Sequence, residues 1–261
     1  MDLLALKLLL APLLVVVASL CARRFGPTTG GLVAGLPIIA GPILLVLTLA
    51  HGHRYGAEAS RAAVLGLLSL TVFVVIYALL SESYSWRIVL PVGWAAFLAA
   101  TAGLNQVSLS VGVSLALSAA GFGLALAVIP RPAAASGRMP AAGWDLPMRA
   151  ASAAILVLVL SALSKALGAQ LAGLLAPFPI VTSVLAVFTH EQLGSDATRR
   201  LLRGMVQGFF AFALFCAIAA VALPEISTSA AFGLASAGAL AVQAGLLSFR
   251  ARAAIVSCKT A

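Results

Sequence analysis

Four charged residues have the types and the spacing needed to form and break ion pairs. Glu58 and Arg61 lie three positions apart in the motif GAEASR, and Asp196 and Arg199 repeat that spacing in the motif GSDATR. On a helix, this spacing puts the acid and the arginine on one face, where a local ion pair forms. An acid in the first turn also complements the helix dipole. We favour this structural role, and the alternative is that the four residues act in gating or in coupling to a proton.

A repeated segment rich in proline and glycine precedes each of these motifs. Residues 31–38 read GLVAGLPI and residues 173–180 read GLLAPFPI, at an offset of 142 (173 − 31). The charged motifs repeat at an offset of 138 (194 − 56), which predicts that four residues (142 − 138) are missing from the loop of the second copy. Duplicated halves with proline-interrupted spans are typical of membrane transporters and indicate where the binding site lies.

Prolines are expected to break the helix in both segments. A proline lacks the backbone N–H and clashes with the carbonyl four residues earlier, so Pro37 should free the carbonyl of Val33, and Pro179 that of Leu175. We predict a substrate-binding site where the two broken segments cross, formed by Thr28, Thr29, Gly35, Pro37, Gly41, Pro177, Pro179, Thr182 and Ser183. The alternative is structural, since Pro, Gly and other small residues are common where membrane helices pack closely.

Other chemistry has little support in the sequence. The motifs GxSxG and HExxH and the P-loop are absent, so we expect no enzyme activity and no cofactor. His51 and His53 are expected on the opposite membrane face from His190, so they are interpreted as interfacial polar residues rather than as metal ligands. The three cysteines lack the spacing of a disulfide framework or a zinc site.

The composition indicates an integral membrane protein. The chain has 261 residues, of which 62% are hydrophobic and 9% are charged, and its mean hydropathy is +1.14. A soluble domain has about 25% charged residues. The net charge of +9 is interpreted as a topological signal between apolar runs, and not as a sign of a nucleic-acid partner. The abundance of arginine and alanine favours a bacterial inner membrane.

The apolar runs predict an all-α fold with about nine transmembrane helices, since a helix needs about 20 apolar residues to cross a bilayer. Lys and Arg are concentrated in the loops that lie inside when the N-terminus is outside and the C-terminus is cytoplasmic. Five spans separate the two broken helices, the second and the seventh, so the halves should be inverted. The predicted organisation is a first repeat of five spans, a cytoplasmic loop, an inverted repeat of four spans and a cytoplasmic tail, at residues 1–129, 130–149, 150–249 and 250–261.

The run RRFGPTTGGLVAGLPIIAGP resembles a segment of uncharacterised bacterial inner-membrane proteins. The overall plan is similar to that of inverted-repeat secondary transporters such as the bile-acid symporter and cation/proton antiporter superfamily. In those families the broken helices come late in each half, whereas here they come second, so no residue role is carried over. The resemblance implies transport by alternating access.

Three functions are therefore expected in decreasing order. The first is a secondary transporter or exporter of a small organic solute, with anions among the candidates. The second is a flippase for a lipid or an isoprenoid phosphate, and the third is a non-catalytic membrane scaffold subunit. The expected partners are a small molecule or a lipid, and the sequence permits a homodimer. All seven acids lie at or near the ends of predicted spans, so any ion coupling would use hydroxyls, backbone carbonyls or one of the gate acids.

Overall fold

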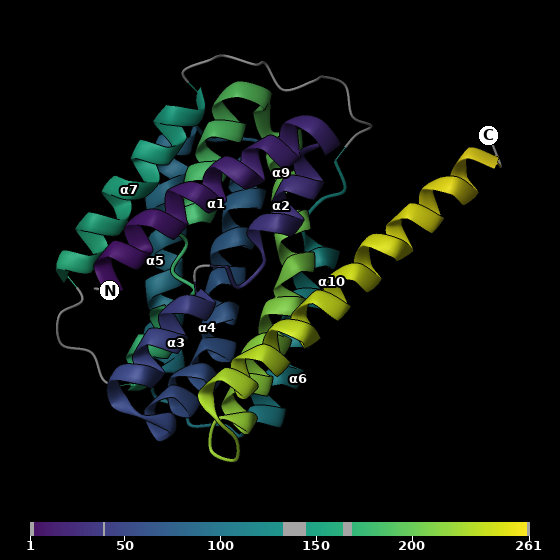
Figure 1. Cartoon of the computed structure of the whole chain (residues 1–261). Coiled ribbons are helices and arrows are strands. Elements are labelled where there is room, and N and C mark those ends of the chain that lie inside the picture. The colour runs from purple at the N-terminus through teal and green to yellow at the C-terminus, as the bar shows by residue number, and fades with distance from the viewer. Residues whose placement is uncertain (1–2, 39, 133–144, 164–168, 260–261) are drawn as a thin grey trace.

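A computed structural model describes residues 3–38, 40–132, 145–163 and 169–259. These residues form ten helices and no strand (Figure 1). The helices are α1 (Leu3–Phe25), α2 (Pro27–Ala34), α3 (Ala40–His51), α4 (His53–Leu80), α5 (Trp86–Leu104), α6 (Val111–Val128), α7 (Asp145–Leu163), α8 (Ala169–Leu175), α9 (Ile180–Ala222) and α10 (Thr228–Lys259). The predicted all-α class is confirmed, and most of the predicted loop 130–149 lies outside the described residues.

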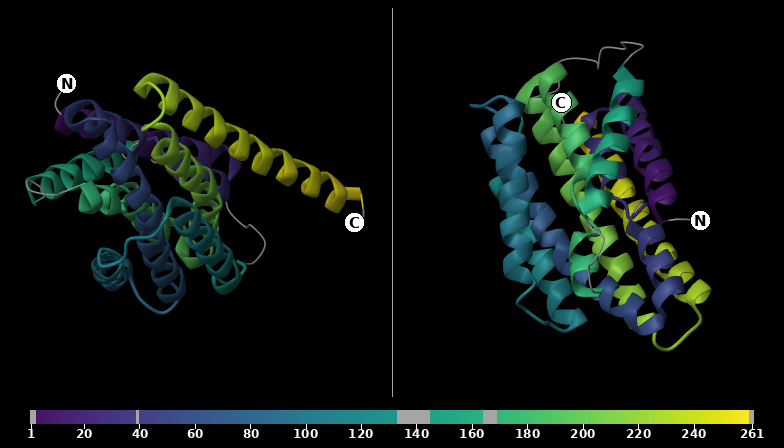
Figure 2. Two further views of the ribbon diagram at one scale, coloured as in Figure 1. Left: turned by 90° about the horizontal axis from the view of Figure 1, so that it is seen from below. Right: turned by 90° about the vertical axis from the view of Figure 1, so that its left-hand side faces the viewer.

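Five helical segments are long and apolar enough to cross a membrane. They are His53–Leu80, Trp86–Leu104, Val111–Val128, Gly173–Ala222 and Thr228–Ser248. Helix α3 is equally apolar but shorter. The chain is therefore a multi-pass membrane protein. The C-terminal part of α10 projects beyond the bundle (Figures 1 and 2), and it continues as a helix through most of the segment that the sequence had assigned to a tail.

The two proline-containing segments are broken in the same way. Helix α2 ends at Ala34 before Pro37, and α8 ends at Leu175 before Pro179. Each break is closed by a turn, in which Leu36 N–H donates to the Val33 carbonyl (3.2 Å) and Phe178 N–H donates to the Leu175 carbonyl (3.0 Å). The expectation that the prolines leave these two carbonyls free is wrong, because the tighter turn supplies the donor that proline lacks.

Two glycines with positive φ precede the two central helical segments. Gly52 (φ 89°) lies directly before α4, and Gly194 (φ 79°) divides α9 into the segments 180–193 and 195–222. Residues other than glycine rarely adopt such a φ. Both glycines therefore mark equivalent places, at an offset of 142 (194 − 52). The predicted alignment of GAEASR with GSDATR is wrong by four residues, and the counterpart of Arg61 in the structure is Arg203.

Short helices from each half pack against the central helix of the other half. A Cβ on Gly31 of α2 would collide with the Leu201 carbonyl of α9, and a Cβ on Gly173 of α8 would collide with the Ala59 carbonyl of α4. These two contacts are related by the same offset of 142 (173 − 31 and 201 − 59). Close backbone approach through glycine is a common way to pack helices in membranes, and here it interlocks the two halves of the chain.

The central pair, α4 and the segment 195–222 of α9, packs antiparallel. Arg199, near the start of that segment, donates to the carbonyl of Ala78 near the end of α4 (3.2 Å). At the other end, Thr228, just beyond α9, lies 2.9 Å from His53 at the start of α4. The pair forms the core of the bundle, with α5 and α6 beside α4 and α10 beside α9. Gly52 and Gly194 consequently lie at opposite ends of the pair.

Candidate binding pocket

A pocket of about 350 Å³ lies beside the break between α2 and α3. The broken segment and α3 form one wall, and α9 and α10 form the other. The lining residues are Leu36, Pro37, Ile38, Gly41, Pro42, Leu45, Phe215, Phe232, Ser236, Ala239 and Leu240. Its volume is within the range of about 300–1,000 Å³ that small-molecule sites occupy.

Small side chains leave this space open. Gly41 presents no side chain, and a Cβ built on it would lie 3.2 Å from Cζ of Phe215. On α10, Ser236 and Ala239 lie three positions apart and both line the pocket. Ser236 and Leu240 are exposed, Leu240 by 63%, so the pocket opens to the surface along α10.

The chemistry of the lining is apolar. Ser236 is the only lining residue with a polar side chain, and no charged residue lines the pocket. Within the described part of the chain, no group of His, Cys, Asp or Glu is arranged to hold a metal ion. The pocket can therefore hold an apolar group by exclusion of water, but it offers no counter-charge to an anion.

At the second break, aromatic side chains occupy the corresponding region. Phe178 lies between Phe97 and Trp94 of α5, with ring centroids 5.1 Å and 6.1 Å away. Trp94 Nε1 donates a hydrogen bond of 2.9 Å to Ser183 Oγ at the start of α9. Phe97 is fully buried. This cluster packs the second break, whereas the first break is open.

The predicted binding residues separate into two groups in the structure. Pro37 and Gly41 line the pocket, and Thr182 and Ser183 are buried in the N-terminal part of α9. Pro177 packs against Gly66, and Pro179 is the N-cap of α9. The pocket lining contains none of the residues from the second break, so it is built on the first break alone.

The remaining predicted residues of α2 serve helix packing. Thr29 Oγ1 donates to the Phe25 carbonyl (3.2 Å) within its own helix. The Thr28 carbonyl contacts Gly204, and Gly35 approaches Gly208, so both positions lie in the close contact between α2 and α9.

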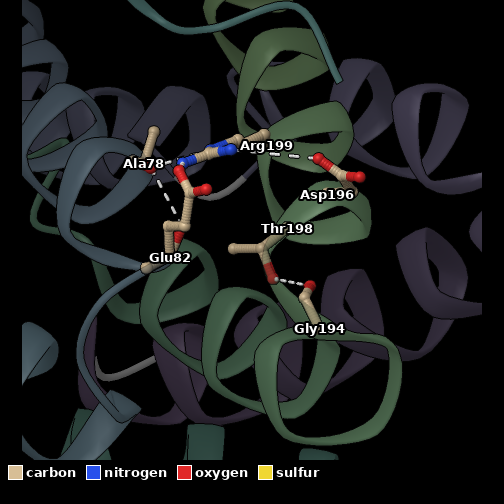
Figure 3. A network of polar contacts seen from close by, with 7 residues as sticks. Ala78, Glu82, Gly194, Asp196, Thr198 and Arg199 are labelled. Carbon is tan, nitrogen blue, oxygen red and sulfur yellow. Dashed lines mark hydrogen bonds and ion pairs between the residues drawn. The ribbon is translucent and has the colours of Figure 1, made fainter. Parts of the chain in front are cut away.

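Arg199 forms the central ion pair of the described residues. Its side chain is 8% exposed, and its Nη2 donates to Glu82 Oε2 at 2.5 Å. Its Nη1 lies 3.9 Å from Asp196, the acid expected as its partner from the spacing. Figure 3 shows Arg199 extending from α9 toward Ala78 and Glu82, with Asp196 on the other side. The main partner therefore comes from the loop after α4, and it joins two helices rather than one helical turn.

Arg61 has different partners from those expected. It donates to Ser108 Oγ (3.5 Å) and to the Leu109 carbonyl (3.4 Å), both in the loop before α6. Glu58 forms no ion pair with it among the described residues. The expected Glu58–Arg61 pair is therefore wrong, because α4 starts at His53 and the motif lies inside that helix, where Arg61 reaches the neighbouring loop.

The histidines form separate local contacts. His51 stacks on Tyr55 with ring centroids 4.5 Å apart, and His190 meets the edge of Tyr77 at 5.9 Å. His53 lies beside Thr228, as described above.

Sequence reasoning missed the half of the pocket that α9 and α10 supply, namely Phe215, Phe232, Ser236, Ala239 and Leu240. A usable signal was present in the spacing. At the offset of 142, Ser236 aligns with Trp94 and Ala239 with Phe97 (236 − 94 and 239 − 97), so small residues on α10 replace large ones on α5.

Comparisons with family models, with curated proteins and with solved structures gave no match. The function of this chain must therefore be argued from its own pocket, from the break that forms it and from the contacts between its two halves.

Proposed function

We propose that the protein is a secondary transporter that moves a small organic solute across a bacterial inner membrane by alternating access. The observation that supports this most directly is the pocket at the α2–α3 break. Broken helices at the interface of two halves are where transporters of inverted-repeat design bind their substrates. The Pro37 turn supplies one wall of such a site here.

The proposal includes an inverted repeat of about nine crossings with the N-terminus outside. Three pairs of features at the offset of 142 support it: the turns before Pro37 and Pro179, the positive-φ glycines Gly52 and Gly194, and the glycine contacts of α2 and α8. The antiparallel packing of α4 and the segment 195–222 is what inversion requires. Helix α6 has no counterpart in the second half, which gives an odd number of crossings.

Gating residues follow from the same geometry. Arg199 joins α9 to the loop after α4 at one end of the central pair through Glu82. At the opposite end, Arg61 contacts only neutral groups. We propose that the Arg199–Glu82 pair is the latch of one access route. Glu58 and Asp196 are then secondary to it.

An apolar solute is better supported than an anionic one, because the lining contains no Lys or Arg. A lipid flippase is the second candidate, and the observation in its favour is the opening along α10 at the exposed residues Ser236 and Leu240. Both functions use the same pocket, so they differ in the size of the cargo.

The test combines binding with transport in purified protein. A panel of apolar and anionic solutes is screened for increased thermal stability, because a ligand of the folded state raises stability by mass action. Hits are then tested for counterflow in proteoliposomes. We expect Gly41→Leu, which fills the pocket, to abolish both effects. Gly233→Leu, on α10 where a side chain meets open space, should leave them intact. Binding without counterflow, or counterflow that survives Gly41→Leu, would overturn the proposal.

A further inference from the structure

We propose that the pocket binds a single aliphatic chain, which enters sideways from the hydrocarbon core of the membrane between α3 and α10. The inference rests on the proposed function and specifies the class of its ligand. Three observations carry it: the depth of the opening, the chemistry of the lining and the difference between the two breaks.

The opening lies at the middle of a membrane-crossing segment. The apolar segment of α10 extends from Thr228 to Ser248, and the lining residues Ser236, Ala239 and Leu240 lie near its centre. A helix that crosses the bilayer places its central residues in the hydrocarbon, roughly 15 Å from either interface in a core about 30 Å thick. A ligand that enters here comes from among the lipid chains and not from water.

The lining favours a chain over a headgroup. Phe215, Phe232 and the aliphatic residues of α3 provide apolar contact, and Ser236 offers one hydroxyl. A charged or strongly hydrated group would lose its water without gaining partners, which costs several kcal/mol or more. A methylene chain loses nothing of this kind. It also gains dispersion contacts with the walls.

The two breaks differ at the positions that decide whether a chain fits. Ser236 and Ala239 of α10 correspond to Trp94 and Phe97 of α5, and Leu36 corresponds to Phe178 (178 − 36 = 142). Helices α5 and α10 both begin six residues after the preceding helix ends (86 − 80 and 228 − 222). Because the aromatic residues pack the second break, the chain provides its own example of this pocket in a filled form.

The experiment uses the full chain in phosphatidylcholine vesicles that contain a trace of palmitic acid with a photoreactive diazirine at mid-chain. A parallel arm carries the same diazirine on one acyl chain of phosphatidylcholine. After irradiation, the labelled peptides are identified by mass spectrometry. We expect labelling of the pocket residues at least ten-fold above that of exposed residues elsewhere on the lipid-facing surface, such as Leu124 of α6. Labelling in the first arm alone indicates a free amphiphile, and labelling in both indicates bilayer lipid.

Two filling variants and one matched control make the result decisive. Ser236→Trp and Ala239→Phe introduce the residues of the second break, and each should reduce pocket labelling at least five-fold. Leu234→Trp lies on the same helix at an exposed position outside the pocket and should not change it. The milder Ala239→Leu serves if the aromatic variants fail to fold. Equal labelling of pocket and surface, or labelling unchanged in the filling variants, would overturn the inference.

The inference and the transport proposal fail in different ways. If the chain labels the pocket but neither solute nor lipid crosses the vesicle membrane, aliphatic binding stands and transport is wrong. If counterflow of a short polar solute is sensitive to Gly41→Leu while no chain labels the pocket, transport stands and the aliphatic ligand is wrong.

Discussion

Arg61 of α4 and Arg203 of α9 hold opposite ends of the same helix, α6. Arg203 Nη1 donates to the carbonyls of Leu126 (2.7 Å) and Ile129 (2.6 Å) at the C-terminal end. Arg61 contacts the loop before its N-terminal end. The two arginines are related by the offset of 142 (203 − 61), so one repeated position serves to fix the helix that has no counterpart. A cation at a helix C-terminus also complements the helix dipole.

Arg203→Gln should be the more damaging of the two corresponding substitutions. It removes two short charged hydrogen bonds from carbonyls at the end of α6, and we expect a loss of about 2 kcal/mol in the free energy of unfolding. Arg61→Gln removes longer bonds at a half-exposed site, and its cost should be below about 1 kcal/mol. Equilibrium unfolding in mixed micelles measures both. Equal losses would contradict the assigned roles.

Glu82→Gln should weaken the Arg199 site more than Asp196→Asn does. Glu82 is the short contact of a buried guanidinium, whereas Asp196 is 3.9 Å away and 46% exposed. We expect about 1 kcal/mol for Glu82→Gln and close to zero for Asp196→Asn. The same unfolding measurement compares them. A larger effect of Asp196→Asn would return the site to the helix-turn pair expected from the motif.

The Arg199–Glu82 pair should also control access at its end of the bundle. Ser81 is 2% exposed, and Ser81→Cys in a chain whose native cysteines are replaced should react slowly with a water-soluble maleimide. Adding Arg199→Gln should speed that reaction several-fold, whereas adding Arg61→Gln should leave it unchanged. Unchanged labelling in both double variants would show that the pair is structural and not a latch.

Gly31→Ala and Gly173→Ala should disrupt packing between the halves. Each added Cβ collides with a backbone carbonyl, of Leu201 and Ala59 respectively. Overpacking of this kind costs about 1–3 kcal/mol. The control is Gly233→Ala on α10, where the Cβ meets open space, and it should be neutral or slightly stabilising. Thermal melting of the three variants in one detergent provides the comparison, and neutral results for the first two would disprove the close contact.

Gly52 and Gly194 should face opposite compartments. The antiparallel packing of α4 with the segment 195–222 places these glycines at opposite ends of the bundle, and the basic residues after Gly194 favour a cytoplasmic location. Reporter fusions after residues 52 and 194 should therefore report periplasm and cytoplasm respectively. The same compartment at both positions would remove the inverted repeat, and the transport proposal would lose its main support.

Backbone-driven features were the most accessible to sequence reasoning. Pro37 and Pro179 predicted the positions of the two breaks because proline acts locally on its own helix. The release of the Val33 carbonyl was wrong, since a turn formed instead. The register of the second repeat was also wrong, because GAEASR and GSDATR are similar by composition while the geometry is set by the positive φ of Gly52 and Gly194.

Contacts between distant helices were less accessible. The partner of Arg199 is Glu82, 117 positions away (199 − 82), and no local spacing encodes it. The α10 wall of the pocket was missed for a related reason. Ser236 and Ala239 are unremarkable in a small-residue helix, and they acquire meaning only beside Trp94 and Phe97 at the structural offset.

The exchange of short helices between the halves has a consequence for synthesis of the chain. Residues 59–66 of α4 emerge from the ribosome long before Gly173, which fills the groove above them. Until about 110 further residues (173 − 66 = 107) are made, that groove can be covered only by lipid or by the insertion machinery. The first half is thus inserted with an unfinished surface, and the nascent chain completes it by returning to a helix that is already in the membrane.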